Sequence, residues 1–471
     1  MPFEYGVTSK GKPTVIYQNF EYVKEIENVC GTVSWRCRVN QRLKCKARLV
    51  TSGSRVVSKR QPEHNHAGNV ATSLARKAVG EMKNRMAELT ATPSSSQAGV
   101  MSILDDHVLM ALPKQTTVSQ ALRRYKVKIT SAANGGIHLP AIPTDLLFEM
   151  PEAFSDMIQF DSGPGDNRLI LISCAELLDG LARASLWLAD GTFKVVPTLF
   201  FQLYSIHFEF GNGVCPAAVY CLLTNKSADT YDRLLAELKK LIPVAVPETV
   251  LVDFERAAIN SFSTAYTQAA VRGCYFHLCQ SVLRKLNELG LKSVYEDNNE
   301  VRGFIRCLPA LAFVPPEDVT EAFELLVETT PPDIDHIDEL ITYFEHTYIR
   351  GRRLRGRAET YGPAQFPIDV WNQNAAGVDG IARTTNTVEG WHHGLQSLFQ
   401  CHHPTLWTFL SGIKRDMQQQ KARLLQGATG LEHPSKKKYR VLNDRVMRTV
   451  NAFGRTDILT YIRSVAHLSH V

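Results

Sequence analysis

Two short stretches of this sequence decide its fold. Residues 185–193 read SLWLADGTF, and residues 249–255 read TVLVDFE. Each stretch places an aspartate, Asp190 or Asp253, directly after an apolar run with the length and composition of a buried strand. A carboxylate at the end of such a strand is costly unless it faces a cleft, a partner or a metal ion. If the two strands are neighbours in one sheet, repulsion between their carboxylates makes divalent cations the natural partners.

The segments around these two stretches predict an α/β domain with a mixed sheet. Three apolar strands come first, and a helix, a strand, a second helix, a further strand and a third helix follow, which is an α/β order. Beyond residue 291 the texture is helical. The expected strands are 185–189, 198–210, 214–223, 249–252 and 270–276, and the expected helices are 227–241, 255–266 and 278–289.

Length and composition narrow the class of protein. A chain of 471 residues is too long for one ordinary core, so two to four domains are expected. Its 44% hydrophobic and 21% charged residues are typical of a globular protein. No run of uncharged apolar residues is long enough to predict a membrane span. Ten cysteines without a secretory signal favour metal-binding or core roles over disulfides.

The positive charge is concentrated near the N-terminus. Residues 1–70 carry 12 Lys and Arg against 5 Asp and Glu, and residues 36–60 carry nine basic residues and no acid. Such a cluster is the electrostatic footprint of a phosphate-binding surface, although a solvated basic face is the simpler alternative. The candidate DNA contacts in this region are Arg36, Arg38, Arg42, Lys44 and Lys46.

Four residues in the same region are candidates for metal ligands. Cys37, Cys45, His64 and His66 follow the spacing C-x7-C-x18-H-x-H. Two cysteines and two histidines are a common structural zinc set. A small strand-rich unit needs a bound metal for stability because it buries little apolar surface. The spacing departs from the short C-x2-4-C pattern, so cysteines packed as small hydrophobes remain an alternative.

These residues belong to a segment that resembles the FLYWCH-type zinc finger over residues 3–66. The resemblance implies Zn²⁺ bound by the two cysteines and the two histidines, with DNA or protein recognition as the usual role. The basic run 36–60 favours DNA. The aromatic positions that carry the resemblance are Phe3, Tyr17, Tyr22 and Trp35.

The region from about 140 to 400 resembles the MULE (Mutator-like element) transposase domain. The resemblance implies an RNase H-like fold with an Asp-Asp-Glu triad, which maps here to Asp190, Asp253 and Glu389. It also implies two Mg²⁺ or Mn²⁺ ions held by these acids. The motifs that carry it are LADGTFKVVP (188–197), LLTNK (222–226), LVDFERA (251–257), GCYFH (273–277) and RTTNTVEGWH (383–392).

Structural alternatives exist for each acid. Asp190 could open a glycine turn, and Asp253 could cap the helix that follows it. Glu389 lies 136 residues after Asp253, so a helical insertion has to separate them, and its spacing from Asn386 also fits a capping box. Glu255 is the rival third acid, although its side chain is expected on a different face from that of Asp253.

Cys274 and His277 form a C-x2-H pair between the second and third acids. Two ligands do not make a zinc site, so we expect a structural or DNA-contacting role for the pair before a catalytic one. Trp391 is expected in the core, although an aromatic ring could also stack on an unpaired base.

Further basic residues lie toward the C-terminus. Arg352, Arg353 and Arg355 belong to an arginine-rich run that is either a solvated face or a phosphate-tracking surface. Residues 436–438 are three lysines, a short and weak candidate for a nuclear import signal.

These features predict five segments along the chain. A zinc finger is followed by a helical accessory DNA-binding region with a flexible join at 92–97 and a basic helix at 118–128. The first part of an α/β core, an all-helical insertion, and the completion of the core with C-terminal helices come next. The predicted segments are 1–70, 71–150, 151–290, 291–380 and 381–471.

The function predicted from this organisation is cut-and-paste DNA transposition by a DDE-type enzyme. Its partners are double-stranded DNA, as terminal inverted repeats and as target, and a second copy of the chain, in the nucleus and without a membrane. The alternative is a domesticated, catalytically silent descendant that regulates transcription by binding DNA. A zinc-finger interaction protein with an inert scaffold explains the N-terminal segment but not the five motifs of the core.

Overall fold

The computed structural model forms two compact units, residues 1–140 and 141–471. None of the helices within its described residues is both long and apolar enough to cross a membrane. The structure describes residues 3–7, 12–29, 31–58, 62–68, 70–88, 91–133, 139–211, 214–354, 360–429 and 437–468.

The first unit begins with an antiparallel meander in which each strand pairs with the next along the chain. A two-residue turn, Gln18 and Asn19, joins β2 to β3, and both residues have a positive φ, as such tight hairpins require. One face of the sheet buries the ring of Trp35, whose Nε1 donates to the Thr51 hydroxyl at 2.9 Å. The elements are β1 (Glu4–Val7), β2 (Pro13–Tyr17), β3 (Phe20–Glu27), β4 (Thr32–Cys37), α1 (Asn40–Leu43), β5 (Arg48–Ser52) and β6 (Arg55–Val56).

Four helices complete this unit around a core that contains Met82, Val100 and Leu122. The prediction of a flexible linker at residues 92–97 is wrong. Thr92 instead caps a helix, accepting a hydrogen bond from the Ser95 backbone, and Pro93 occupies the first helical position, where a proline costs nothing. The helices are α2 (Val70–Arg85), α3 (Pro93–Met101), α4 (Asp106–Ala111) and α5 (Gln115–Ala133).

The second unit is built on a seven-stranded mixed sheet with the order β13-β12-β9-β10-β11-β8-β7. Strands β9, β12 and β13 run parallel, and the other neighbouring pairs are antiparallel. The mixed α/β fold is therefore confirmed. The strands are β7 (Ile158–Asp161), β8 (Leu169–Ile172), β9 (Leu186–Thr192), β10 (Gln202–Phe208), β11 (Ala217–Leu223), β12 (Thr249–Val252) and β13 (Ala270–Gly273).

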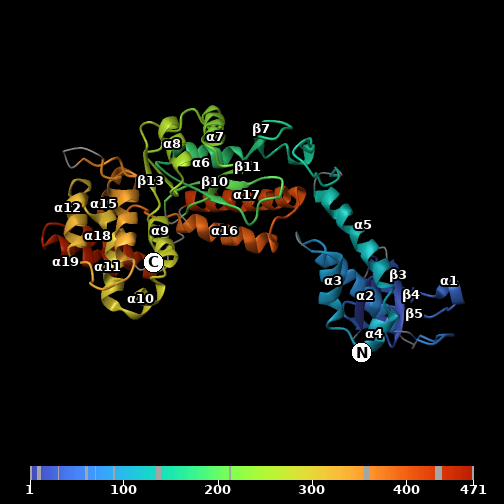
Figure 1. Ribbon diagram of the computed structural model, residues 1–471. Coiled ribbons are helices and arrows are strands. Elements are labelled where there is room, and N and C mark those ends of the chain that lie inside the picture. Colours follow the sequence, from blue (N-terminus) through green and yellow to red (C-terminus); the bar gives the residue numbers. More distant parts are fainter. Residues whose placement is uncertain are drawn as a thin grey trace. The chain divides into compact units, whose positions relative to one another are not determined.

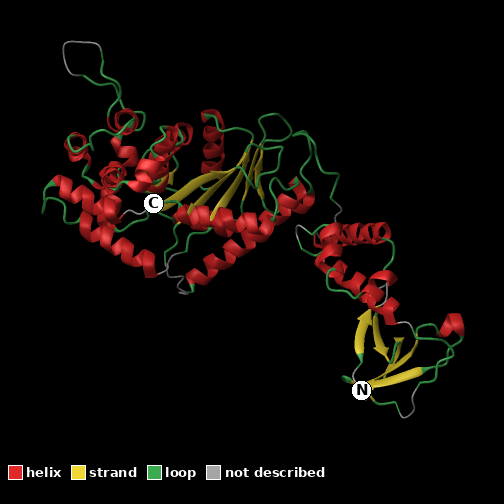
Figure 2. Ribbon diagram, turned by 60° about the horizontal axis from the view of Figure 1, so that its bottom comes forward, coloured by secondary structure: helices red, strands yellow, loops and turns green. Residues whose placement is uncertain are grey.

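Helices cover both faces of this sheet. Helices α7 (Ala228–Leu241) and α8 (Arg256–Ala265) lie on one side, and α16 (Asn386–Phe399) and α17 (Leu406–Ala428) lie on the other (Figure 1). Figure 2 shows the strands of the sheet side by side between these helices. α16 contacts β9, so the helix that carries Glu389 packs on the strand that carries Asp190.

Two expected strands are shorter than the sequence suggested. β10 begins only at Gln202, because the residues before it form turns. β13 ends at Gly273, where a side chain would come within 2.5 Å of the Phe254 ring, and the chain turns directly into a helix. That helix, α9 (Tyr275–Glu288), starts three residues earlier than expected.

Most of the described residues between 291 and 380 lie in helices, as the sequence pattern predicts. The two last helices of the chain, α18 and α19, pack with α11, α12 and α15 of this region and form one helical layer with them (Figure 1). The elements are α10 (Lys292–Asp297), α11 (Asn299–Ala310), α12 (Val319–Val327), α13 (Ile337–Phe344), α14 (Ile368–Trp371), α15 (Asn374–Asp379), α18 (Lys437–Val450) and α19 (Ile458–Leu468), with single turns at Leu311–Phe313, Pro316–Asp318 and Glu345–Ile349.

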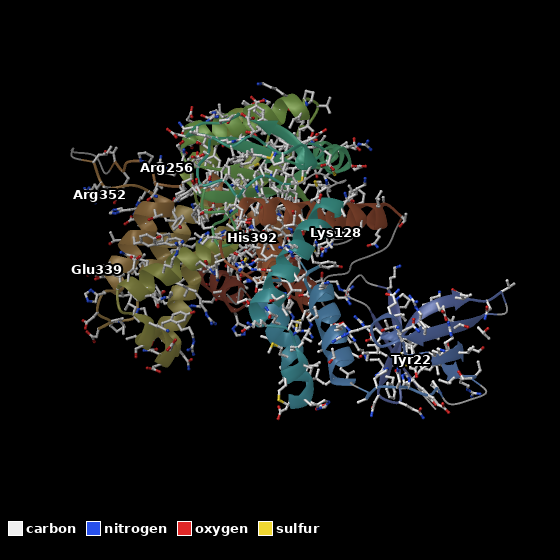
Figure 3. The ribbon with its side chains drawn as sticks, turned by 90° about the vertical axis from the view of Figure 1, so that its right-hand side faces the viewer. Tyr22, Lys128, Arg256, Glu339, Arg352 and His392 are labelled. Carbon is white, nitrogen blue, oxygen red and sulfur yellow. The ribbon has the colours of Figure 1, made fainter. Side chains whose placement is uncertain are left out.

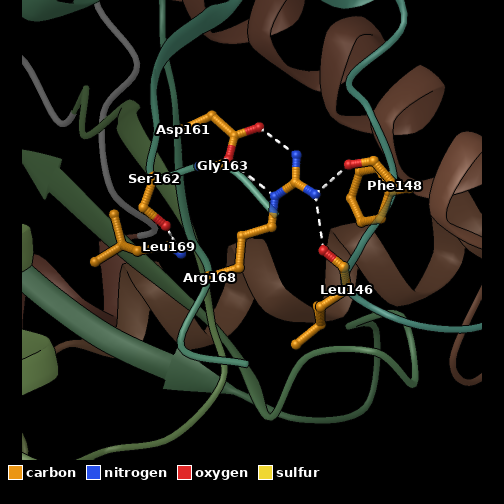
Figure 4. Close-up of polar contacts among 7 residues, drawn as sticks. All are labelled: Leu146, Phe148, Asp161, Ser162, Gly163, Arg168 and Leu169. Atoms are coloured by element: carbon orange, nitrogen blue, oxygen red, sulfur yellow. Dashed lines mark hydrogen bonds and ion pairs between the residues drawn. The ribbon is translucent and has the colours of Figure 1, made fainter. Parts of the chain in front are cut away.

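A buried arginine fixes the entry of the chain into the second unit (Figure 4). Arg168, 1% exposed, donates from two nitrogens to the Asp161 carboxylate at 2.6 and 2.9 Å. The same guanidinium donates to the carbonyls of Leu146 and Phe148 and lies 3.9 Å from the Phe148 ring centre. The segment that leads to β7 is thereby tied to the edge of the sheet. α6 (Ala175–Arg183) follows β8 and leads to β9.

Candidate metal centres

The four candidate zinc ligands meet at one end of the small sheet. Cys37 ends β4 and Cys45 follows α1, and both are buried. Cys37 Sγ lies 3.3 Å from His66 Nε2, Cys45 Sγ lies 3.4 Å from His64 Nδ1, and the two histidine nitrogens are 3.2 Å apart. All four ligand atoms lie within 4.8 Å of one another.

This geometry and its electrostatics fit a zinc ion. Ligands placed tetrahedrally around zinc are separated by about 3.3–3.8 Å, which is the spacing found here. Burial, and then repulsion by His66, lowers the pKa of His64 to about 4, so its imidazole is neutral and free to ligate. Burial raises the pKa of the Cys37 thiol to about 11, a cost that a bound cation reverses. The structure therefore brings the four predicted ligands together, and the cluster supports zinc as the metal.

Tyr22 and Phe20 hold the ring of His64 in place. The Tyr22 hydroxyl lies 2.7 Å from His64 Nε2, so Nδ1 is the nitrogen turned toward the centre. Phe20 stacks on the same ring with centroids 3.6 Å apart. Tyr22 lies inside the small sheet, away from solvent (Figure 3). Sequence spacing gave no sign of this contact, because 42 residues separate the two partners.

The candidate DNA contacts of the first unit differ in their exposure and in whether they pair with an acid. Arg42, Lys44 and Lys46 are exposed on and after α1, and Arg36 is half-buried. Arg38 instead pairs with the buried Glu21 at 3.0 Å. The Glu21 carboxylate also accepts from Arg76 and from the Ser73 hydroxyl of α2, so this cluster joins the sheet to the helices.

The arginine-rich run of the second unit is only partly described. Arg352 and Arg353 are exposed, and Arg352 lies in a loop (Figure 3), whereas Arg355 lies outside the described residues. Arg350, the first of the run, pairs with Glu345 at 2.6 Å and with Glu324 at 2.7 Å.

Asp190 lies in β9, and Asp253 directly follows β12, the parallel neighbour of β9 in the large sheet. Leu251 of β12 pairs with Leu188 of β9, so Asp253 and Asp190 each lie two residues beyond a paired position. Because side chains alternate along a strand, these two steps return both carboxylates to the same face. Asp190 does not end its strand. It pairs with Ser205 of β10, and β9 continues to Thr192, so the glycine-turn alternative is wrong.

Glu389 lies in the first turn of α16, on the face of the sheet that Asp190 occupies. Thr385 is the N-cap of this helix, so Glu389 is its fourth helical residue and cannot close a capping box with Asn386. The neighbouring Val388 packs with Leu188 and Leu251, which places the start of α16 over β9 and β12.

The electrostatics of the three carboxyls reflect their proximity. Burial, followed by repulsion from Asp253 and more weakly from Glu389, raises the pKa of Asp190 to about 8. Burial also raises the pKa values of Asp253 and Glu389. Asp253 Oδ1 is buried without a hydrogen-bond partner. The three carboxylates lie farther apart than the zinc ligands, because among the described residues only the zinc set has all its ligand atoms within 4.8 Å.

Glu255 remains close to the aspartates. Glu255 is the N-cap residue of α8 and makes no side-chain capping bond, so Asp253 is not the cap of this helix and the capping alternative for it is wrong. Burial, and then repulsion by Asp253, raises the pKa of Glu255, whereas hydrogen bonding to Tyr231 lowers it.

Two histidines flank the acids, and sequence spacing did not assign either to them. His392 Nδ1 lies 3.8 Å from Asp190 Oδ2, and His277 Nε2 lies 3.6 Å from Glu389 Oε1. Burial lowers the pKa of each imidazole to about 4, so both rings are neutral at pH 7 and these contacts are not ion pairs. His392 is buried in the second unit.

Comparison with known protein families identifies both parts. The FLYWCH zinc finger domain matches residues 5–66, and the MULE transposase domain matches residues 186–281. Both resemblances seen in the sequence are confirmed, the first over residues 5–66 and the second over residues 186–281 of the expected region from about 140 to 400. A search among curated proteins found no match.

The two matches cover the candidate centres unequally. The FLYWCH finger contains all four zinc ligands. The MULE domain contains β9 to β13 and the start of α9, and with them Asp190, Asp253, Cys274 and His277. Glu389 lies outside the matched residues, so its place beside the aspartates depends on the packing of α16. The match to the MULE transposase domain points to a transposase-related function.

Proposed function

We propose that this protein is a DDE-type DNA transposase that binds terminal inverted repeats and carries out metal-dependent strand cleavage and strand transfer. The observation that carries the proposal is the placement of Asp190 and Asp253 at in-phase positions of adjacent parallel strands. The helix that bears Glu389 packs on the same two strands through Val388.

The strand order supports an RNase H-like core. Three antiparallel strands, β9, β10 and β11, come first in the chain. The next two strands extend the sheet on the other side of β9: β12 pairs with β9, β13 pairs with β12, and both pairs are parallel. In this arrangement the first and fourth strands of the fold are neighbours, which brings Asp190 next to Asp253. The helices between α9 and α16 account for the long separation of the third acid and support a helical insertion there.

The acidic centre has the chemistry expected for divalent cations. Three carboxyls with raised pKa values, one with a buried oxygen that lacks a partner, favour neutralisation by hard cations with oxygen ligands. Asp190, Asp253 and Glu389 would hold two Mg²⁺ or Mn²⁺ ions. Such ions, when bound, activate the attacking oxygen and stabilise the leaving oxygen of a phosphodiester.

The chemistry proposed is hydrolysis followed by transesterification. Water forms a bond to phosphorus at the transposon end, and the 3′ oxygen leaves as a hydroxyl. That hydroxyl then attacks a phosphodiester of the target DNA and displaces a target 3′ hydroxyl. Water is the nucleophile of the first step and the DNA 3′ hydroxyl is that of the second, so no serine or tyrosine nucleophile is required.

The zinc finger supplies DNA affinity in this proposal. Arg42, Lys44 and Lys46 are exposed and close together in sequence, so they can neutralise several phosphates and give a steep dependence of binding on salt. Joining two transposon ends requires paired protein copies, so a homo-oligomer is proposed. A substrate of chromosomal DNA places the protein in the nucleus.

The proposal is tested by nicking of DNA that carries the terminal repeats, in Mg²⁺ or Mn²⁺, with the full chain. Asp190→Asn should lower the nicking rate by at least about 1,000-fold, because it removes a group that acts only with its partners. Asp232→Asn, which changes an exposed aspartate of α7, is the matched control and should nick like the wild type.

Two further variants decide the third acid. Glu389→Gln should be as inactive as Asp190→Asn, whereas Glu255→Gln should retain most of the activity. The opposite result would assign the third position to Glu255. Equal nicking by wild type and Asp190→Asn contradicts the proposal. Specific repeat binding by a wild type that does not nick would favour the domesticated, DNA-binding regulator.

A further inference from the structure

We infer that Cys274 and His277 are positioning residues that dock the first turn of α16 onto the sheet and thereby bring Glu389 to the two aspartates. This inference rests on the proposed function for its catalytic meaning. The docking itself depends only on contacts between the described residues of the second unit.

Cys274 binds the start of α16 directly. Its sulfur accepts hydrogen bonds from the Thr385 backbone N–H at 3.2 Å and from the Thr385 hydroxyl at 3.3 Å. Thr385 is the N-cap of α16, and an N-cap hydroxyl ordinarily accepts from the first turn of its own helix. Here α16 lacks that side-chain cap, and the hydroxyl instead donates to Cys274. The helix therefore starts at a point set by another part of the chain.

Cys274 also touches each element that carries an acid. It shares one buried apolar cluster with Leu188, Leu251 and Val388. Leu188 lies two residues before Asp190, Leu251 lies two residues before Asp253, and Val388 immediately precedes Glu389. The fully buried Cys274 thus fills the space where β9, β12 and α16 meet.

The main chain around Cys274 reinforces this junction. The Cys274 backbone N–H donates at 2.7 Å to the carbonyl of Val252, the residue that precedes Asp253. The next N–H, that of Tyr275, donates to the Arg383 carbonyl at 2.9 Å, just before α16. Together with the Thr385 bonds to the Cys274 sulfur, the Tyr275 bond ties the approach to α16 to two successive residues that follow β13.

His277 contacts the acid itself. It lies three residues after Cys274, one helical turn along α9, so both side chains point to the same side of that helix. Its Nε2 is 3.6 Å from Glu389 Oε1, longer than a hydrogen bond but closed by a shift of less than 1 Å. Its Nδ1 is buried without a partner. A contact of this kind restricts where the Glu389 carboxylate can lie.

Hydrogen–deuterium exchange of residues 386–399 in the full-length, metal-free chain tests the docking. Cys274→Ala removes the acceptor for both Thr385 bonds and should speed exchange in the first turn of α16 by about tenfold or more. Cys274→Ser retains an acceptor and should restore part of the protection. Cys307→Ala, at a buried cysteine of α11, is the matched control and should leave residues 386–399 unchanged.

The metal dependence of nicking tests the positioning of Glu389. His277→Ala should raise the Mn²⁺ concentration for half-maximal nicking by about 10–100-fold, as expected when a residue that orients a ligand is lost. Its unfolding temperature should stay that of the wild type, and His277→Gln should recover part of the affinity. A purely structural histidine would change the unfolding temperature and leave the metal concentration unaltered.

The outcomes separate this inference from the proposed function. Unchanged exchange at 386–399 in Cys274→Ala, or unchanged metal dependence in His277→Ala, overturns the inference even when the wild type nicks DNA. A wild type that does not nick refutes the proposed function, while the exchange experiment still decides the docking. If Cys274→Ala loses protection throughout the sheet, Cys274→Ser decides instead, because it retains an acceptor. Faster exchange than in the wild type that is confined to residues 386–399 then supports the docking, and unchanged exchange there overturns it.

Discussion

Asp416 is a carboxylic acid in the interior of the second unit, 6% exposed on α17. It accepts hydrogen bonds from the Tyr220 hydroxyl at 2.7 Å, from Trp391 Nε1 at 2.9 Å and from Gln420 Nε2 at 3.1 Å. Trp391 is a core residue, as the sequence suggested. Burial raises the pKa of Asp416 above its ordinary value of 3.8 and outweighs these three bonds.

We therefore expect Asp416→Asn to gain stability relative to the wild type as pH rises. A carboxyl whose pKa is raised by folding contributes full stability below pH 3.8, and that contribution is lost as pH rises through the folded value. The asparagine does not ionise, and its amide can donate to Gln420 Oε1, which has no hydrogen-bond partner in the wild type. That bond should raise the free energy of unfolding by roughly 1 kcal/mol. Thermal unfolding of both proteins at pH 5 and pH 8 measures the difference. A stability gap that shrinks with pH would contradict this expectation.

At the scale of elements, single side chains determine where segments begin and how they attach. Thr92 starts a helix where serines and a proline suggested a flexible join. Arg168 holds the segment before β7 by binding two carbonyls and one carboxylate at once, a set of contacts that matches the planar fork of a guanidinium. The residues between 139 and 150 form no strand or helix, so these bonds fix their path.

Arg168→Ala should lower the free energy of unfolding of fragment 141–471 by about 3–5 kcal/mol, because it removes a buried guanidinium and leaves the half-buried Asp161 carboxylate without it. Urea unfolding measures the change. Arg183→Ala is the matched control, since its pair with Asp179 is exposed on α6 and contributes about 0.3–0.5 kcal/mol. Similar losses in the two variants would show that the Arg168 contacts do not stabilise the fold beyond an ordinary surface pair.

At the scale of the whole molecule, each compact unit has its own buried core. The small sheet buries Trp35 and Leu49 beside its two cysteines, and the large sheet buries complete strands such as β10 and β11. The small sheet has little apolar surface to bury, so its stability depends on the bound metal, whereas the large sheet has no such need.

Fragments 1–140 and 141–471 should accordingly fold when expressed separately, and only the first should respond to a zinc chelator. Chelation should remove the cooperative thermal transition of the finger in fragment 1–140, and Cys45→Ser should have the same effect without chelator. Calorimetry of both fragments makes the comparison. A matching loss in fragment 141–471 would show that metal also stabilises the second unit.

The sequence by itself determined the features that local patterns encode. Apolar runs predicted the central strands because burial selects the residues within each run, and the spacing of Cys37, Cys45, His64 and His66 predicted zinc because the metal dictates its ligands. The order of strands and helices gave the mixed sheet, and two motif sets gave the FLYWCH finger and the MULE domain. Strand ends were less predictable: β9 continues past Asp190 because pairing with β10 continues there.

Only the tertiary structure decided which distant residues meet. The hydroxyl of Tyr22 reaches His64 across 42 residues, and Asp416 meets Tyr220 across 196. Cys274 contacts the N-cap of α16 across 111 residues. Hydrophobic periodicity and capping signals act within a few residues, whereas these contacts arise when separate elements pack. A single sequence carries no local signal of that packing.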